Sequence, residues 1–180
     1  MCADEPAISG PQQRHSSRIL VIVLVAVVAL FTASRFVKSE KTIIGATAEV
    51  IETDTGLVFQ ARVDTGASVS SIHCEEFVIE GESPAPAENI GKTILLHLTN
   101  KQGETKSLKT RIVDYSPIRS ADGTSHRYYV RLTMSCQGVE RESLVTLNDR
   151  SRMSHRLLLG RDFLKGNFLV DLNKDNHDFR

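Results

Sequence analysis

The chain has 180 residues, and its 22 Lys and Arg balance its 22 Asp and Glu, so the formal net charge is zero at pH 7. A balanced charge without a strongly basic block gives no electrostatic reason to expect a nucleic-acid partner. The length suits one domain with an appendage.

The N-terminal part predicts a membrane anchor. Residues 1–18 are polar and rich in turn-forming residues, which is typical of a disordered tail. Residues 19–33 (ILVIVLVAVVALFTA) carry no charge. In a helix they span roughly 22 Å, less than the roughly 30 Å hydrocarbon core, but the apolar character continues to Val37. We therefore expect a transmembrane helix over 19–37, followed by a linker over 38–42.

A cleavable secretory signal peptide is the alternative, because its apolar region is commonly this short and Thr32-Ala33-Ser34 offers a weak cleavage site. We favour the uncleaved anchor. Basic residues lie on both sides of the run, so they determine its orientation poorly. With the N-terminus inside, the remaining chain is exported. The expectation is a single-pass inner-membrane protein with a periplasmic domain.

The sequence predicts strands throughout the exported part. From Thr42 onward, turn signals recur about every ten residues, and Leu57, Phe59 and Ala61 alternate with residues of the opposite face. Short strands with frequent turns predict an all-β barrel or sandwich. Only 161–165 looks like a helical turn. Further strands are expected at 93–99, in the extended run to 112, and at 126–135, 139–147, 155–160 and 167–172.

Asp-Thr-Gly occurs twice, at Asp54 and at Asp64. Asp54 precedes an alternating strand, where the triplet is typical of a hairpin turn. Asp64 lies at the other end of that strand, and small residues follow it, which suits a tight loop where two backbones approach closely. Roughly ten residues of extended chain, about 30 Å, separate the two carboxylates, so they cannot share a proton.

Peptide hydrolysis by two carboxylates needs them near contact, where like charges cannot both ionise and the pair holds one proton. The ionised member accepts a proton from the attacking water, and the protonated member donates to the scissile carbonyl. A two-fold axis supplies two identical carboxylates from one sequence. We therefore predict that Asp64 is catalytic, that its partner is Asp64 of a second copy, and that Asp54 is not involved.

Two segments carry a family resemblance, VDTGASVSSI from Val63 and LLLGRDFL from Leu157. They resemble the retropepsins, the aspartic proteases of retroviruses, and more closely a bacterial group often labelled "ATP-dependent zinc protease". In retropepsins a strand leads into Asp-Thr-Gly-Ala, and a later Gly-Arg segment packs beside that loop and opens the single short helix. The resemblance covers roughly residues 43–172. It implies an all-β, retropepsin-like closed barrel with one short C-terminal helix, in a protease domain over 43–180.

The resemblance also implies roles for particular residues. Asp64 would be the catalytic aspartate, and the Thr65 hydroxyl would hydrogen-bond across the dimer axis. Gly66 would lie where substrate backbone binds, and Gly160 would let its strand approach the catalytic loop. An Asp-Gly hairpin would form a flap that closes over substrate. The flap candidates are Ala121, Asp122 and Gly123, and the residues expected to support the catalytic loop are Thr65, Gly66, Ala67, Ser68, Gly160 and Arg161.

The sequence departs from the retroviral pattern at Ser68, where those proteases usually have an Asp that pairs with the Arg of Gly-Arg. Arg161 is therefore expected to pair with a carboxylate elsewhere or with a carbonyl. Ser68 is expected to hydrogen-bond the Asp64 carboxylate. The polar, Pro-containing loop at 80–89 also lengthens the domain, which bears on substrate preference and dimer geometry.

No cofactor or metal is expected. The chain has neither a phosphate-cradling Gly-x-x-x-x-Gly-Lys-Ser/Thr motif nor His-Glu-x-x-His, and its six histidines are scattered without ligand spacing. Cys2, Cys74 and Cys136 have no CxxC spacing. A Cys74–Cys136 bridge and free thiols both remain open.

These patterns together predict a membrane-anchored, homodimeric aspartic endopeptidase. It would act on a peptide or protein substrate through one Asp64 from each subunit. The alternative is a non-catalytic module of the same fold that binds an extended peptide in its groove.

Overall fold

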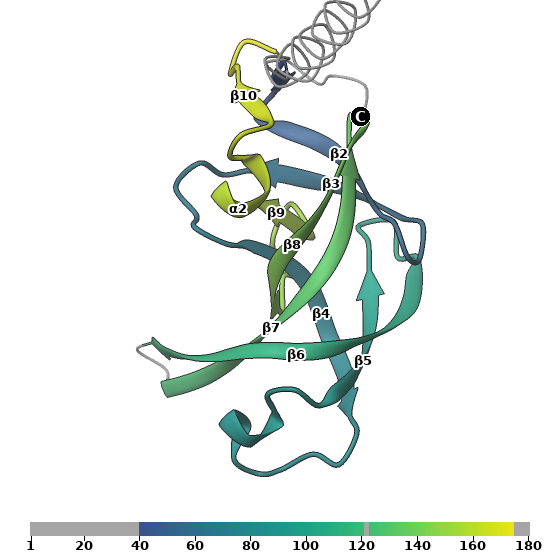
Figure 1. Ribbon diagram of the computed structural model, residues 1–180, viewed down its shortest axis with the longest axis vertical. Helices are drawn as coiled ribbons and strands as arrows, with labels where there is room; N and C mark the ends of the chain where they lie inside the picture. The colour runs from purple at the N-terminus through teal and green to yellow at the C-terminus, as the bar shows by residue number, and fades with distance from the viewer. Residues whose placement is uncertain (1–39, 121–122, 175–180) are drawn as a thin grey trace, which may run out of the picture. The chain divides into compact units, whose positions relative to one another are not determined.

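The computed structural model describes residues 40–120 and 123–174, which fall within one compact unit, Glu40–Arg180 (Figure 1). Strands dominate these residues, which also hold one short helix, α2 (Arg161–Leu164), and a 3-10 turn, η2 (Pro86–Asn89). The predicted all-β fold with a short helix near the C-terminus is confirmed for them. In chain order the strands are β1 (Thr42–Ile44), β2 (Thr47–Glu52), β3 (Leu57–Val63), β4 (Ser70–Ile79), β5 (Thr93–Thr99), β6 (Thr105–Ser120), β7 (Gly123–Cys136), β8 (Val139–Asn148), β9 (Leu157–Leu159) and β10 (Phe168–Val170).

The strand pairings close a barrel. β2 pairs with β3, β3 with β9, and β9 with β4. β4 then pairs with β8, β8 with β7, and β7 returns to β2. A closed ring removes the free edges along this path. The predicted closed barrel is therefore confirmed, and β5 and β6 form a second arc from β4 to β7 (Figure 1).

Period-two alternation explains which residues make the core. β3 buries Leu57, Phe59 and Ala61 while Val58 and Arg62 stay exposed, because successive residues of a strand point to opposite faces. Burying a large aliphatic or aromatic side chain stabilises the fold by about 1.5–3 kcal/mol. The largest fully buried side chains are Phe59, Phe163, Ile44, Leu57, Ile72, Ile94, Leu96, Leu98, Ile112, Leu132, Met134 and Leu157.

β4 serves both parts of the sheet. Its first half, from Ser70 to His73, pairs in parallel with β8, and its second half pairs with β5. A register shift between Cys74 and Glu76 marks a bulge, which lets one strand turn from one partner to the other. His73 is the last residue paired with β8, opposite Asn148, so it lies beside the loop that follows β8.

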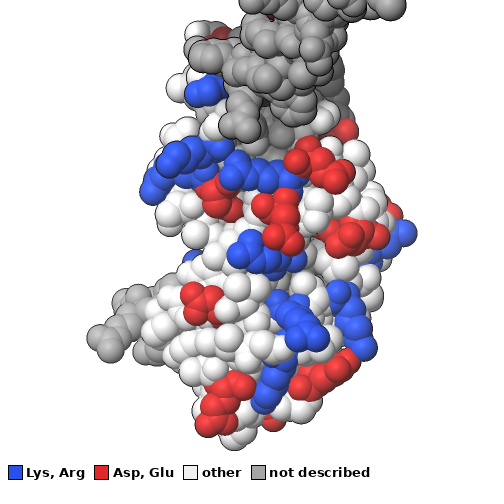
Figure 2. Space-filling model, viewed as in Figure 1, with Lys and Arg blue, Asp and Glu red and all other residues white. Residues whose placement is uncertain are grey.

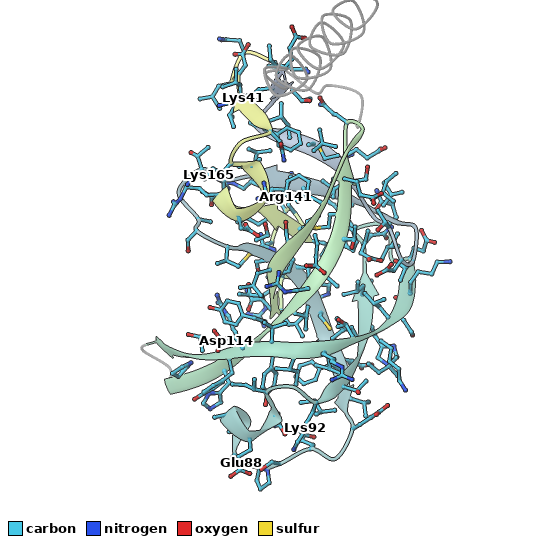
Figure 3. The ribbon with its side chains drawn as sticks, viewed as in Figure 1. Lys41, Glu88, Lys92, Asp114, Arg141 and Lys165 are labelled. Atoms are coloured by element: carbon cyan, nitrogen blue, oxygen red, sulfur yellow. The ribbon has the colours of Figure 1, made fainter. Side chains whose placement is uncertain are left out.

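The loop at 80–89 is tied to the sheet by Asn89, which is 1% exposed. The Asn89 amide nitrogen donates to the carbonyl oxygen of Ser83 at 3.0 Å and to the Tyr128 hydroxyl at 2.9 Å. Its Oδ1 accepts from the Ser83 N–H at 2.7 Å and from Lys92 Nζ at 2.9 Å. Figure 3 labels Glu88 and Lys92 in this region. The predicted polar loop thus carries an ordered turn, η2, because a buried amide satisfies its backbone.

The predicted tail and transmembrane span, residues 1–37, lie outside the described residues. Within the part of the chain that the structure describes, no helix is long and apolar enough to cross a membrane. Figure 2 shows charges of both signs interspersed over one face of the barrel.

Cys74 and Cys136 are both buried free thiols, which resolves the alternative left open above. Burial raises the pKa of each to about 11. Both thiols therefore stay protonated near neutral pH and are poor nucleophiles.

Candidate active site

Asp64 lies immediately after β3, at the start of a tight loop. Its backbone N–H donates to the carbonyl oxygen of Leu159 in β9 at 2.9 Å. Its Oδ1 accepts the N–H groups of Gly66 at 2.9 Å and Ala67 at 3.2 Å. Its Oδ2 has no hydrogen-bond partner among the residues that the structure describes. Backbone amides thus orient the carboxylate through one oxygen and leave the other available.

The second predicted segment packs against this loop through backbone hydrogen bonds. β9 lies between β3 and β4, so the residues after it reach the Asp64 loop. The N–H of Arg161 donates to the carbonyl oxygen of Ala67 at 2.9 Å, and the N–H of Asp162 donates to that of Ser68 at 3.3 Å. The loop therefore binds to the N-terminal end of α2.

The Arg161 side chain binds the same loop. Its Nη1 donates to the carbonyl oxygens of Thr65 at 3.1 Å and Gly66 at 2.7 Å. Of the two partners expected for Arg161, a carboxylate or a carbonyl, the structure shows carbonyls. A charged donor on two successive carbonyls restricts the peptide planes that carry Asp64.

Gly160 is required by the close approach of two backbones. An added Cβ would lie 2.6 Å from the carbonyl carbon of Val69 and 2.8 Å from its oxygen. The φ of Gly160, −89°, is one that any residue adopts, so the constraint is steric. A larger residue would push β9 and α2 away from the loop that carries Asp64.

Ser70 and Asp162 form a further support that the sequence did not predict. The Ser70 hydroxyl, fully buried, donates to Asp162 Oδ1 at 2.8 Å and accepts the N–H of Gly160 at 3.0 Å. Burial raises the pKa of Asp162, and its Oδ2 is buried without a partner among the described residues. Two features of the sequence could have indicated this support: Asp162 directly follows Gly-Arg, and Ser70 occupies an inward-facing position of a strand.

Ser68 corrects one expectation. It is exposed, and within the described residues no hydrogen bond joins its hydroxyl to the Asp64 carboxylate, whose Oδ1 accepts two backbone amides. Backbone amides can reach this oxygen because the loop folds back on itself. Thr65 is also exposed, and within the described residues no hydrogen bond of its hydroxyl is seen. The predicted residues that meet at this site are Asp64, Thr65, Gly66, Ala67, Ser68, Gly160 and Arg161.

The predicted flap hairpin exists as paired strands. β6 and β7 pair up to Ser120 and Gly123. Two of the three flap candidates, Ala121 and Asp122, lie outside the described residues. In Figure 1 the paired ends of β6 and β7 extend to one side of the barrel. Closure over substrate stays a prediction.

An open cleft of about 480 Å³ borders the Asp64 loop. Residues 66–69 line one side, Arg127 and Tyr129 of β7 line another, and Arg150 comes from the loop after β8. The cleft therefore runs from the carboxylate loop toward the strand that carries one arm of the predicted flap.

Arginines give this cleft a positive charge. Arg150 is only 6% exposed, and its Nε donates to the carbonyl oxygen of His155 at 3.1 Å. Burial lowers the pKa of Arg150, and the positive charges of Arg127 and Arg62 lower it further, while Asp64 acts in the opposite direction. Sequence reasoning missed this cluster because its members come from three distant segments.

His73 is 4% exposed and lies beside the same loop. Its Nδ1 accepts the backbone N–H of Arg150 at 3.0 Å, so the neutral ring carries its hydrogen on Nε2. Glu75 and Asp149 place carboxylate oxygens within 4.8 Å of a His73 ring nitrogen and of each other. A metal ion needs a free lone pair on that ring, and this hydrogen-bonding pattern leaves none.

Asp54 lies in the β2–β3 turn, as predicted for a hairpin. Buried Glu52 holds the turn, because its carboxylate accepts the N–H of Asp54 at 3.2 Å and that of Thr55 at 2.9 Å. Gly56 completes the turn with a φ of +71°, which favours glycine. β3, which is 7 residues long and spans roughly 20 Å, lies between Asp54 and Asp64.

A closed barrel with an Asp-Thr-Gly loop held by a Gly-Arg segment defines a retropepsin-like fold and site. The model of one family, described as "RimB-like: Retropepsin-like aspartic endopeptidase RimB", matches residues 43–177. The chain belongs to this RimB-like family.

Two curated relatives match across 121 residues, which is 62% of this chain and 24% of each relative. Both are named "Probable alpha-L-glutamate ligase"; the one from Shewanella pealeana is 34% identical and the one from Shewanella halifaxensis 32%. The chain thus spans about a quarter of the length of these relatives. Among solved structures, Lpg0085 of Legionella pneumophila, titled a protein with unknown function (DUF785), is similar with a TM-score of 0.59 and 25% identity, over 73% of this chain and 94% of that one.

Proposed function

We propose that the protein is an aspartic endopeptidase whose active site forms when Asp64 of two copies meets at a two-fold axis. The observation that carries this proposal is the state of the Asp64 carboxylate. Two amides fix one oxygen, and the other has no partner among the described residues. One carboxylate cannot act as base and acid in the same step, so a half-site of this kind is completed by a second one.

In the proposed mechanism the two Asp64 carboxylates share one proton. The ionised one takes a proton from the attacking water, and the protonated one donates to the carbonyl oxygen of the scissile bond. Arg161 and the amides of the loop hold the carboxylate in position, so little reorganisation is needed during the reaction.

An exposed apolar strand pair supports a docking surface for the second copy. β1 pairs in parallel with β10, and Ile43 lies opposite Leu169. Ile43 is 48% exposed and Leu169 is 52% exposed. Adjacent apolar side chains on a two-stranded sheet gain stability when a second sheet covers them.

We further propose that the preferred substrates carry acidic side chains, glutamate in particular. The positive charges of Arg127 and Arg150 at the cleft favour carboxylates over lysine or arginine side chains. The names of the curated relatives, glutamate ligases, also support glutamate as the side chain to test first.

The membrane anchor over 19–37 and a periplasmic protease domain remain part of the proposal. They rest on the uncharged run at 19–33. Anchoring would confine two copies to a plane, which favours a weak dimer.

The two Asp-Thr-Gly triplets provide the test and its matched control. The full chain is assayed with a quenched fluorescent peptide that has glutamate on both sides of the cleaved bond, and with its glutamine counterpart. Asp64→Asn should abolish cleavage, and Asp54→Asn should leave it nearly unchanged.

Pepstatin should inhibit the wild type. Equal loss from both substitutions would refute the assignment, and peptide binding without any cleavage would favour the non-catalytic binding module.

A further inference from the structure

One hydrogen bond connects the interior of the barrel with the cleft. The backbone N–H of Arg150 donates to Nδ1 of His73 at 3.0 Å, and the side chain of Arg150 lines the cleft. We propose that His73 is a pH-dependent positioning residue: in its neutral form it holds Arg150 at the cleft, and its protonation releases Arg150 and weakens the binding of acidic substrates. This inference rests on the acidic substrate preference proposed above.

Protonation must break this bond, because the imidazolium ring carries hydrogen on both nitrogens and Nδ1 then has no lone pair to accept with. Two N–H groups would face each other at 3.0 Å. Asp149 Oδ1, 3.6 Å from Nδ1, is a charged acceptor available for the new N–H, and the backbone of Asn148 also favours the protonated ring. Since Asp149 immediately precedes Arg150, exchanging the backbone N–H of one residue for the carboxylate of the other requires the loop to shift.

Arg150 is held by hydrogen bonds at its backbone and at its side chain. Within the described residues, its backbone N–H donates to His73, its carbonyl oxygen accepts the N–H of Met153 at 3.0 Å, and its Nε donates to the carbonyl oxygen of His155 at 3.1 Å. The bond to His73 is the one that ties the backbone of Arg150 to the barrel strand β4, so its loss lets the residue move together with its side chain. A displaced guanidinium no longer presents its charge to a substrate carboxylate in a fixed geometry. We therefore expect KM to change more than kcat.

Charges of both signs face His73. Arg156, which leads into β9, disfavours the imidazolium, while Asp149 and Glu75 favour it. Glu76 of β4 and His97 of β5 line the cavity of about 400 Å³ beside the His73 ring. Burial is the largest influence, and with Arg156 it lowers the pKa of His73 below the ordinary value of 6.5. Arg150 is therefore held at neutral pH and released as the pH falls below that value.

Three variants of the full chain separate this role from a structural one. Asparagine places its Oδ1 near the position of Nδ1, so His73→Asn keeps an acceptor that does not titrate. His73→Ala removes the acceptor, and His97→Asn, the same substitution at another histidine that lines the neighbouring cavity, is the matched control. KM is measured from about pH 7.5 to about pH 5 with the glutamate peptide and its glutamine counterpart. The protonation of the glutamate side chains of the free peptide is measured over the same range as a control.

For the wild type, KM for the glutamate peptide should rise about tenfold as the pH falls, the size expected for one lost hydrogen bond to the cleft, while kcat changes less. His73→Asn should remove this rise, His73→Ala should show the high KM at every pH, and His97→Asn should behave as wild type. The glutamine peptide should show no such rise. A rise of the same size in His73→Asn would overturn the proposal, as would its presence with the glutamine peptide.

Two measurements that need no cleavage keep this result separate from the endopeptidase proposal. The dissociation constant of the glutamate peptide for Asp64→Asn should follow the same pH dependence, abolished by adding His73→Asn. Nuclear magnetic resonance should show the Arg150 amide losing its hydrogen-bond protection as His73 titrates. If His73 becomes protonated while the Arg150 amide is unchanged, or if the peptide does not bind at any pH, the inference fails. If binding responds as expected but the wild type never cleaves, the endopeptidase proposal alone fails.

Discussion

Arg161 donates from Nη1 to the carbonyl oxygen of Gly66 at 2.7 Å, and Gly66 in turn donates its N–H to Oδ1 of Asp64 at 2.9 Å. The guanidinium is thus one peptide unit away from the carboxylate that we propose as catalytic. An arginine that holds a loop through its carbonyls can set the position of a carboxylate without touching it.

Replacing Arg161 tests this positioning. Arg161→Ala leaves the carbonyl oxygens of Thr65 and Gly66 accessible to water, so the free energy of unfolding should change by no more than about 1 kcal/mol. Loss of the positioning contact should lower kcat by up to about 100-fold, the effect of a misplaced catalytic group. Urea unfolding and steady-state kinetics measure the two quantities.

Arg141 provides the matched control for Arg161. Its Nη1 donates to the carbonyl oxygens of Phe163 at 3.2 Å and Lys165 at 2.8 Å, the same two-carbonyl pattern at the other end of α2 (Figure 3). Arg141→Ala should affect stability by a similar amount and leave kcat unchanged. Equal effects of Arg141→Ala and Arg161→Ala on kcat would mean that α2 as a whole matters, and that the contact with the Asp64 loop does not.

Gly160→Ala should destabilise the protein by about 1–3 kcal/mol, because the added Cβ would lie 2.6 Å from the carbonyl carbon of Val69, a backbone atom that cannot move aside freely. Gly66→Ala is the contrasting variant. Its Cβ would lie 3.2 Å from Oδ1 of Asp64, a side-chain atom that can shift, so it should lower kcat with little change in stability. An unchanged urea midpoint for Gly160→Ala would contradict the close packing.

Mixing wild type with Asp64→Asn tests the shared site directly. If each site needs one Asp64 from each of two copies, activity at constant total protein should fall with the square of the wild-type fraction after subunits have exchanged. Mixing with Asp54→Asn should leave activity constant. A linear fall with Asp64→Asn would show that each chain works alone, and the two-fold site would have to be abandoned.

Asp162 predicts a pH dependence of stability. Burial raises its pKa above the ordinary 3.8, so between 3.8 and the raised value the folded chain binds this proton more readily than the unfolded chain. Its contribution to the free energy of unfolding therefore grows as the pH falls through this window and is lost as the pH rises.

Asp162→Asn removes the titration and keeps Oδ1 as acceptor for Ser70. Relative to wild type, the variant should be more stable near about pH 7 and lose that advantage toward about pH 4, as measured by urea unfolding. A difference that stays constant across this range would mean that Asp162 does not titrate between the two states.

Much of the barrel follows from local pattern. The alternation of Leu57, Phe59 and Ala61 predicted β3, and the extended run over Thr93–Thr99 matches β5. The predicted helical turn matches α2 within a residue. Period-two burial is a property of a strand and its immediate neighbours, so it can be read without knowing which strands pair.

The arrangement of Arg62, Arg127 and Arg150 had no such local signal. These residues come from β3, β7 and the loop after β8, and only barrel closure brings their charges together. The same holds for His73 and Arg150, which the parallel pairing of β4 with β8 brings together. The Ser70–Asp162 bond joins residues 92 positions apart.

The sequence by itself determined that the part from Thr42 onward is all-β and that Asp64, not Asp54, lies in a loop of small residues beside Gly160 and Arg161. The tertiary structure decided what holds that loop and what charge the cleft carries. The physical reason is range: strand alternation and turn chemistry act over a few residues, whereas hydrogen bonds and charge clusters depend on which distant segments the closed sheet places side by side.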